Sequence, residues 1–379
     1  MKVLYLQNID GVAGSEKYFL ALIPELIKKG IEVEMYCVVK QINKSKAKEF
    51  TNLLNEVNIP YFVQYVKSYT ALKIPYNLNK YIKSKRIDIV HTHLIYADFW
   101  GALVKKIFNK EVKIISTKHG YHENTYVEYC NNPTMLPKNT YYRLFKFTHK
   151  YIDRSYACSF GLREFYEKGE LINKGEMDVI QHGFNYPDIS DFDHTEFRFS
   201  KNQLIIVGRL IKRKGHHFVF EILDEIIKVY PDLKLVILGS GELEGELKDL
   251  VKKLNIESYV EFLGFKPDVE KYLSASDVAL VPSYSEGLPL VIFEAFNAKV
   301  PIVTFNSIGC NELVIDNETG LVAESFLKEQ FLAKTLILLG NKDLQNKFSN
   351  NGYEKLKSYF SLERMTNNTI SYYHETISQ

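Results

Sequence analysis

The chain has 379 residues, of which 46% are hydrophobic and 25% are charged, and its net charge is +2. This composition is typical of a soluble globular protein of two domains and excludes a disordered chain. No apolar run reaches the roughly 18 residues of a membrane span, and the opening MKVLYLQN predicts a strand rather than a signal peptide, so we expect a cytoplasmic protein.

In the first half of the chain, short β-branched or aromatic runs alternate with helical patterns, which is typical of parallel βαβ units. A segment rich in Asp and Ser, residues 186–203, then interrupts the pattern and is the predicted interdomain linker. Strands are predicted over residues 3–7, 32–39, 61–66, 88–92, 113–117, 155–159 and 179–181.

The alternation restarts in the second half, so the sequence predicts an α/β protein with two doubly wound sheets. Ligands of such sheets bind at the carboxyl ends of the strands. Strands are predicted over 204–207, 235–238, 260–263, 278–281 and 302–305, and helices near 216–229, 242–254, 267–275, 288–298 and 327–339.

The charge is split between the halves. Residues 1–180 hold 27 Lys and Arg against 18 Asp and Glu, or +9, and the remainder holds 21 against 28, or −7. In one basic segment, Lys138, Arg143, Lys146 and Lys150 alternate with aromatic residues, which suits an anionic membrane surface or an anionic acceptor. A solvated helix face is the alternative. Nucleic acid is not an expected partner, because the whole chain is nearly neutral and shows no binding motif.

Several loops follow predicted strands. Gly11 and Gly14 precede the first helix, where they favour either close approach of an anionic ligand or a plain tight turn. HTH (91–93) and KHG (118–120) end two later strands, so their imidazoles are candidates to reach one ligand site. The three signals are weak individually.

Metal sites and disulfides are not expected. Cys37, Cys130, Cys158 and Cys310 are scattered without a CxxC pair. Asp191-Phe192-Asp193 matches a DxD pattern for a metal diphosphate, but it lies in the predicted linker and away from any strand end.

A cluster of cations follows the first strand of the second half. Arg209 ends the strand, and Lys212, Arg213 and Lys214 precede Gly215 and a helix. A guanidinium and an ammonium at a strand's carboxyl end together match a diphosphate. A solvated loop is the alternative reading.

Two carboxylates, Glu286 and Glu294, stand on either side of the start of the predicted helix after strand 278–281. The helix LPLVIFEAFNA is apolar nearly all round, so Glu294 is expected to be buried and to need a polar partner. A structural ion pair or cap would also satisfy it. No GxSxG, P-loop or HExxH motif is present, and the combination of cations with carboxylates fits a nucleotide-sugar.

EGLPLVIFEAFNAKVPIV resembles the Glu-x7-Glu signature of the retaining GT-B glycosyltransferases of family four, also called glycosyl transferases group 1. GVAGSEKY, GRLIKRKG and IGCNELVIDNETGLV resemble other parts of the same family. Ala13-Gly14 and His182-Gly183 depart from its usual Gly-Gly and Asn-Gly. The resemblance implies two Rossmann-like domains facing a central cleft: an acceptor domain over 1–186, a donor domain over 187–360, and a C-terminal helix over 361–379 that crosses back.

The resemblance also implies residue roles. Arg209 and Lys214 would hold the diphosphate, Glu294 the ribose hydroxyls, and Glu286 the donor sugar, with His119 contacting that sugar from the other domain. The implied catalytic residues are Glu286, His119, Arg209 and Lys214, and the implied donor-binding residues are Gly14, Arg209, Lys214, Gly264, Phe265, Lys266, Glu286, Gly287, Leu288, Pro289 and Glu294.

The expected activity is therefore metal-independent, retaining transfer of a hexose from a UDP- or GDP-sugar, with no other cofactor. The expected acceptor is a glycan or lipid-linked glycan of surface polysaccharide, made at the inner face of the plasma membrane. The alternatives are a GT-B nucleotide-sugar epimerase, a phosphorylase, and a non-catalytic nucleotide-sugar-binding subunit.

Overall fold

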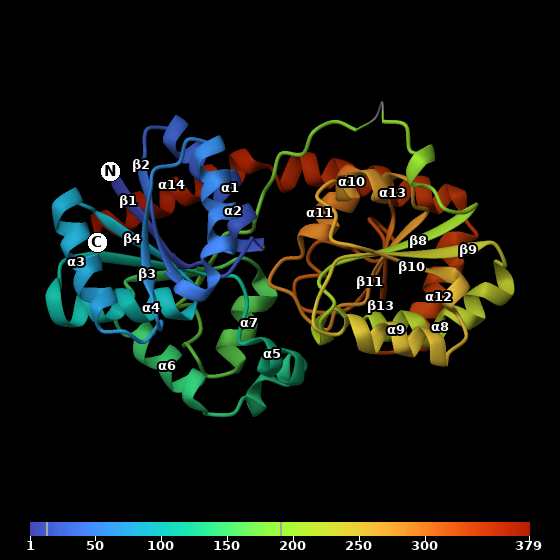
Figure 1. The fold of residues 1–379 in the computed structure, drawn as a ribbon, viewed down its shortest axis with the longest axis horizontal. Coiled ribbons are helices and arrows are strands. Elements are labelled where there is room, and N and C mark those ends of the chain that lie inside the picture. The colour runs from blue at the N-terminus through green and yellow to red at the C-terminus, as the bar shows by residue number, and fades with distance from the viewer. Residues whose placement is uncertain (13, 190–191) are drawn as a thin grey trace. The chain divides into compact units, whose positions relative to one another are not determined.

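The structure is a computed structural model that describes residues 1–12, 14–189 and 192–379 (Figure 1). The chain divides into two compact units. Unit 1 comprises residues 1–122, 132–185 and 361–379, and unit 2 comprises residues 123–131 and 186–360. Each unit has one parallel sheet with helices on both faces, so the predicted α/β class is confirmed.

The sheet of unit 1 has the strand order β3-β2-β1-β4-β5-β6-β7, and every neighbouring pair is parallel. The chain turns back from β3 to β4 across β1, which makes the sheet doubly wound. Its strands are β1 (Lys2–Asn8), β2 (Glu32–Lys40), β3 (Tyr61–Val66), β4 (Ile89–His93), β5 (Lys113–Lys118), β6 (Arg154–Ala157) and β7 (Asp178–Val179).

Helices cover the two faces of this sheet in separate apolar cores. One core holds α1, α2 and α14 against the sheet, and the other holds α3, α4 and the π-helix η2. The helices of unit 1 are α1 (Gly14–Lys28), α2 (Lys44–Glu56), α3 (Lys73–Lys85), α4 (Leu94–Leu103), η2 (Val104–Phe108), α6 (Thr140–His149), α7 (Phe160–Lys168) and α14 (Leu362–Ser378), with 3-10 turns η1 (Gln41–Asn43) and η3 (Pro133–Met135).

The sheet of unit 2 has the order β10-β9-β8-β11-β12-β13, again parallel throughout. Its last strand, β13, was not predicted. The strands are β8 (Asn202–Val207), β9 (Leu233–Leu238), β10 (Val260–Gly264), β11 (Val278–Val281), β12 (Ile302–Phe305) and β13 (Leu321–Ala323).

The helices of unit 2 include one that comes from the first half of the chain. This helix, α5 (Glu123–Tyr129), belongs to unit 2 by its contacts although it lies between β5 and β6 in sequence. The other helices are α8 (His216–Val229), α9 (Glu244–Lys253), α10 (Val269–Ser274), α11 (Leu290–Asn297), α12 (Lys328–Leu339) and α13 (Lys342–Tyr359), with 3-10 turns η4 (Thr195–Phe197), η5 (Lys212–Lys214) and η6 (Glu257–Tyr259).

The C-terminal helix α14 is part of the core of unit 1. The side chain of Ser361 caps its first turn by accepting a hydrogen bond from the Arg364 N–H. Tyr373 is fully buried, and its hydroxyl lies 2.7 Å from the Tyr5 hydroxyl and 2.7 Å from His91 Nδ1. The last helix of the chain thereby completes a polar network beneath strands β1 and β4.

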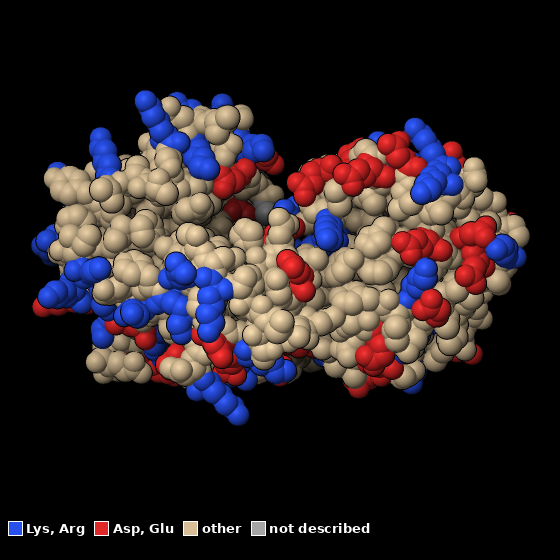
Figure 2. Space-filling view, turned by 90° about the horizontal axis from the view of Figure 1, so that it is seen from below, with Lys and Arg blue, Asp and Glu red and all other residues tan. Residues whose placement is uncertain are grey.

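The described residues include no helix that is both long enough and apolar enough to cross a membrane. Unit 1 carries 28 Lys and Arg against 18 Asp and Glu, or +10, and unit 2 carries 20 against 28, or −8. On the face seen in Figure 2, basic side chains predominate over unit 1, whereas acidic and basic side chains mix over unit 2.

We predict that Tyr373→Phe lowers the free energy of unfolding of unit 1 by about 1–3 kcal/mol, because it leaves buried partners on Tyr5 and His91 unsatisfied. Denaturant unfolding measures this loss. Tyr65→Phe removes a hydroxyl from a half-exposed tyrosine of the same unit and should change stability by less than about 0.5 kcal/mol. Equal effects of the two substitutions would contradict the role given to Tyr373.

Candidate active site

Glu286 lies in the loop between β11 and α11, and its backbone is fixed on both sides. Its N–H donates to the carbonyl of Ile308 at 2.9 Å, and its carbonyl accepts from the hydroxyl of Tyr126 at 3.0 Å. Gly309 follows Ile308 with φ +79°, and a Cβ there would come within 2.7 Å of the Glu286 carbonyl oxygen. Only glycine fits both the conformation and the space, so the loop that holds Glu286 depends on it.

The Glu286 carboxylate is buried and pairs with two cations of η5. Arg213 Nη1 lies 2.7 Å from one carboxylate oxygen, and Lys214 Nζ lies 2.6 Å from the other. Burial opposes ionisation of Glu286, but the charges of Arg213 and Lys214 outweigh it and lower the pKa of the carboxyl to about 2. The Glu286 side chain is therefore a carboxylate at neutral pH, and it accepts hydrogen bonds without donating any.

The turn η5 brings these cations to the carboxyl ends of β8 and β11. It ends at Gly215, which has φ +67° and ψ 22° and also begins α8. A Cβ at Gly215 would lie 2.0 Å from the carbonyl oxygen of Pro282, directly after β11. The missing side chain thus lets η5 approach the Glu286 loop closely enough for a direct ion pair.

Arg209 is placed differently from the other cations of this segment. Its side chain is 55% exposed, and Nη2 lies 3.6 Å from the carboxylate of Glu123 on α5. Glu123 also lies 3.8 Å from Arg213 Nε. Lys214 is therefore held, half-buried, in the ion cluster with Glu286, whereas Arg209 is accessible to an anion from solvent.

Sequence reasoning missed three contributors to this cluster: Arg213, Glu123 and Tyr126. Arg213 was visible as one cation in a basic run, but nothing in the run indicates which of its members points toward Glu286. The segment around Glu123 and Tyr126 has no helical periodicity and lies more than 80 residues from its partners, so no sequence signal links it to them.

The helix α11 is as apolar in its surroundings as predicted, since residues 291–297 are all buried. Glu294 is 5% exposed, which confirms the predicted burial of this acid. Burial, reinforced by the charges of Glu294 and Glu270, raises the pKa of Tyr186 well above its usual value. The Glu294 carboxylate thus lies near the Tyr186 hydroxyl, and its role toward ribose stays a prediction.

The remaining predicted residues lie at strand ends or helix starts. In unit 2, Gly287, Leu288 and Pro289 are buried, and Pro289 is the N-cap residue of α11. Gly264 ends β10, and the side chain of Phe265 after it is 72% exposed. Lys266 is half-buried. In unit 1, Gly14 begins α1 and is exposed, and His119 follows β5 and is half-buried.

Of the two histidines of HTH, His91 is a core residue. Its ring nitrogens lie 2.7 Å from the hydroxyls of Tyr373 and Thr117, and the side chain is fully buried. The expectation that its imidazole reaches a ligand is therefore wrong. His93 lies beside His119 instead, with Nδ1 2.9 Å from His119 Nε2.

No group of three or more His, Cys, Asp or Glu arranged to hold a metal occurs in residues 1–12, 14–189 and 192–379. Asp191 of the predicted DxD pattern lies outside these residues. Asp193 is exposed, and its carboxylate accepts hydrogen bonds from the backbone N–H and the hydroxyl of Thr195. These contacts are those of a capped surface turn.

The low pKa of Glu286 predicts a pH dependence of stability. The folded-state pKa of about 2 lies below the usual 4.5, so the ion pair stabilises the folded state above pH 4.5, by about 3 kcal/mol. This contribution is lost as the pH falls from about 4.5 to about 2. Urea unfolding at pH 7 should show Glu286→Gln less stable than the native chain, and the difference should shrink at pH 3. A difference that is constant with pH would contradict the ionised pair.

Models of two families match nearly the whole chain. Residues 12–186 match "Glycosyltransferase Family 4", and residues 190–355 match "Glycosyl transferases group 1". An uncharacterized glycosyltransferase of Haemophilus influenzae is 27% identical over 350 residues, which are 90% of each chain.

Two further comparisons agree with these matches. The UDP-Gal:alpha-D-GlcNAc-diphosphoundecaprenol alpha-1,3-galactosyltransferase of Escherichia coli is 24% identical over 96% of this chain and 94% of its own. Anabaena Alr3699/HepE, solved with UDP and glucose, matches the fold with a TM-score of 0.81 at 18% identity, over 99% of this chain and 100% of its own. The chain belongs to the group 1 glycosyltransferases and has the GT-B fold.

Proposed function

We propose that this glycosyltransferase moves a hexose, with retention of configuration and without a metal, from a UDP- or GDP-sugar to a glycan or lipid-linked glycan. The observation that carries the proposal is the ion cluster of buried Glu286 with half-buried Arg213 and Lys214 at the carboxyl ends of β8 and β11, where ligands of doubly wound sheets bind. A buried carboxylate paired with partly exposed cations at such a site suits a ligand that has both hydroxyls and phosphates.

Arg209 and Lys214 would contact a diphosphate in different ways. Arg209 is accessible and offers a guanidinium for bidentate contact with phosphate oxygens. Lys214 supplies an ammonium from a protected position, which offsets charge that develops on the leaving group and takes the place of a metal. Gly14, Gly264, Phe265 and Lys266 are the proposed contacts to the rest of the donor, Phe265 by offering an exposed ring to the base.

The two acids have separate roles in this proposal. Glu286 stays ionised at neutral pH, so it accepts hydrogen bonds from donor-sugar hydroxyls, next to backbone contacts from Gly287, Leu288 and Pro289. Glu294 accepts from the ribose hydroxyls. His119 contacts the donor sugar as a neutral side chain, because burial and the charge of Lys118 lower its pKa to about 4.

The acceptor is proposed from the relatives. The Escherichia coli enzyme is named for UDP-galactose as donor and a diphosphoundecaprenol-linked sugar as acceptor, and it aligns with 96% of this chain. A similar lipid-linked intermediate would place this enzyme in lipopolysaccharide or capsule synthesis at the inner face of the plasma membrane. An epimerase would convert the donor without any acceptor, and a phosphorylase would need inorganic phosphate, so product analysis with donor alone separates these alternatives.

We predict that Lys214→Ala and Glu286→Gln each lower kcat/KM for transfer about 100-fold, because each removes a charged contact to the donor. The measurement is release of nucleotide from the sugar nucleotide that raises the Tm most in a UDP-, GDP-, ADP- and dTDP-sugar panel. Lys228→Ala removes an exposed lysine from α8 in the same unit and serves as the matched control. Unchanged transfer in Lys214→Ala would overturn the site assignment.

We further propose that unit 1 contacts an anionic membrane, but through α3 rather than α6. In α6 the aromatic Tyr142 and Phe145 are buried and Arg143 and Lys146 are exposed. The interleaved pattern of that segment therefore belongs to an amphipathic helix whose aromatic side packs on the core, and α6 offers little apolar surface to lipid.

The α3 surface combines exposed apolar groups with lysines. We define it as the side chains of Leu72, Lys73, Tyr76, Lys80, Ile107 and Phe108, all of which are exposed. The rings of Tyr76 and Phe108 are 6.2 Å apart, and Lys80 Nζ lies 4.8 Å from the Tyr76 ring. The helix itself has four lysines and no acidic residue. Its charge is thus complementary to anionic lipid.

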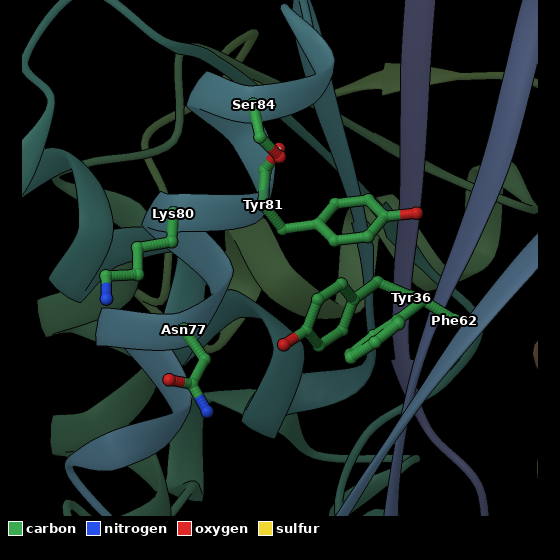
Figure 3. Close-up of a pocket in the computed structure, with 6 residues that line it drawn as sticks. All are labelled: Tyr36, Phe62, Asn77, Lys80, Tyr81 and Ser84. Carbon is green, nitrogen blue, oxygen red and sulfur yellow. The ribbon is translucent and has the colours of Figure 1, made fainter.

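A shallow pocket of about 300 Å³ adjoins this surface (Figure 3). Lys80 is shared by the pocket and the α3 surface, and the pocket brings together rings from β2, β3 and α3. Its lining residues are Tyr36, Phe62, Asn77, Lys80, Tyr81 and Ser84. Aromatic rings beside an ammonium are suited to the boundary between lipid headgroups and acyl chains.

We predict that the chain sediments with vesicles of phosphatidylglycerol and phosphatidylcholine but not with phosphatidylcholine alone. Charge reversal in Lys73→Glu/Lys80→Glu should weaken the binding about tenfold or more, since each basic residue near an anionic surface contributes about 1 kcal/mol. Arg143→Glu/Lys150→Glu on or beside α6 changes the net charge equally and should have a smaller effect. Equal losses would indicate attraction by net charge alone and overturn the α3 surface.

A further inference from the structure

Three histidines of unit 1 gather at the carboxyl ends of β4, β5 and β7. His93 ends β4, His119 follows β5, and His182 follows β7. The rings of His93 and His119 are stacked with centroids 5.2 Å apart at 23°, and His119 lies 5.3 Å from His182. The phenol of Tyr5 also stacks on His93, with ring centroids 5.3 Å apart at 13°. His119 is half-buried, whereas His93 is fully buried.

One hydrogen bond fixes which nitrogen of His119 is left for a ligand. His93 Nδ1 lies 2.9 Å from His119 Nε2, so that nitrogen of His119 is occupied. Within the described part of the chain, His119 Nδ1 and His93 Nε2 are both buried atoms without a hydrogen-bond partner. Of the two ring nitrogens of His119, only Nδ1 therefore remains available to a ligand. The ring nitrogens of His93 make no hydrogen bond in the described residues other than the one to His119.

The direction of this hydrogen bond follows from the surroundings of His93. If His119 donated, His93 would carry its proton on Nε2, as an N–H without an acceptor among the rings of Tyr5, Phe19 and His91. If His93 donated, the N–H without an acceptor would instead be on His119 Nδ1. His93 is fully buried, whereas His119 is half-buried, so a bound ligand can accept from an N–H of His119 but not from one of His93. With a ligand present, the bond is therefore best satisfied with His93 Nδ1–H donating to His119 Nε2.

We propose that His93 is a positioning residue that holds His119 in the tautomer with its proton on Nδ1, so that His119 donates a hydrogen bond to an oxygen of the bound donor. This inference rests on the proposed function for the identity of the ligand, but not for the tautomer. His93, which is fully buried and would not itself touch the ligand, thereby has a role in binding it. We also expect a ligand oxygen with a free lone pair opposite Nδ1 of His119, such as a sugar hydroxyl.

The neighbouring charges are compatible with a neutral pair. Burial lowers the pKa of His93 well below its usual value, with further contributions from His91, His119, His182 and Lys118. Burial and Lys118 likewise lower the pKa of His119 to about 4, against an opposing contribution from Asp98. Both rings are neutral at pH 7, and a neutral imidazole has one donor and one acceptor, as the proposed bond requires.

The tautomers are tested directly with ¹⁵N-histidine-labelled protein in long-range ¹H–¹⁵N spectra without any ligand. The expected result is a protonated Nδ1 and an unprotonated Nε2 for both rings, with signals assigned from His93→Asn and His119→Asn. A proton on Nε2 of His119 would overturn the proposal. Because no substrate is present, this outcome is independent of whether the chain transfers sugar.

Kinetics separate positioning from a merely structural role. His93→Phe keeps a ring beside His119 but removes the donor, and it should lower kcat/KM about tenfold, which is the lower end of the loss seen when a group that orients a metal-binding histidine is removed. His93→Asn places an amide nitrogen where Nδ1 was and should restore most of the loss. Equal losses in His93→Phe and His93→Asn would contradict the proposal.

A second pair of variants tests the ligand-facing atom. The Asn amide overlaps Nδ1 of histidine and the Gln amide overlaps Nε2, so His119→Asn should retain more transfer than His119→Gln. His91→Asn is the matched control in the same stack, because both nitrogens of His91 are used internally. It should lower Tm and leave the His119 tautomer and KM unchanged. A wild-type chain with the predicted tautomer and no transfer would refute the proposed function alone.

Discussion

The ion cluster of Glu286 with Arg213 and Lys214 is the constraint on which the site in unit 2 depends. A buried carboxylate is unfavourable by itself, and it is stable here because two cations lie within 2.7 Å of its oxygens. Those cations reach it only because Gly215 lets η5 pass against Pro282. The proposed ligand site and the packing of β8 against β11 are thus two consequences of one arrangement of backbone and charge.

Unit 1 also buries polar side chains, among them a group of neutral ones that hydrogen-bond to one another. Tyr5 of β1 and His91 of β4 are joined by hydrogen bonds through the hydroxyl of Tyr373, which α14 supplies. Burial keeps the imidazole of His91 uncharged, so this region contributes directed hydrogen bonds but little electrostatic potential. In the proposed function, hydrogen bonds of this kind suit the hydroxyls of a sugar, and the charges of unit 2 suit a diphosphate.

Much of this organisation can be predicted from the local sequence, whereas the rest depends on tertiary contacts. Alternating strands and helices and the apolar α11 around Glu294 follow from periodicity. The three-residue strand β13 is too short to give a recognisable sequence pattern, and the segment of α5 lacks helical periodicity. The cation run after β8 indicates a charged site, but the choice of Arg213 as the partner of Glu286 depends on the turn at Gly215. Likewise HTH and KHG suggest neighbouring histidines, yet only tertiary contacts show that His91 faces the core and His93 faces His119.

In the proposed function, the cation and carboxylate cluster of unit 2 binds the diphosphate of a nucleotide-sugar. The most direct measurement is a crystal structure of the chain with the nucleotide that stabilises it most. We expect the diphosphate to lie within hydrogen-bond distance of Lys214 Nζ and the Arg209 guanidinium, with the ribose at Glu294. A nucleotide bound elsewhere, with the Glu286 cluster untouched, would contradict it.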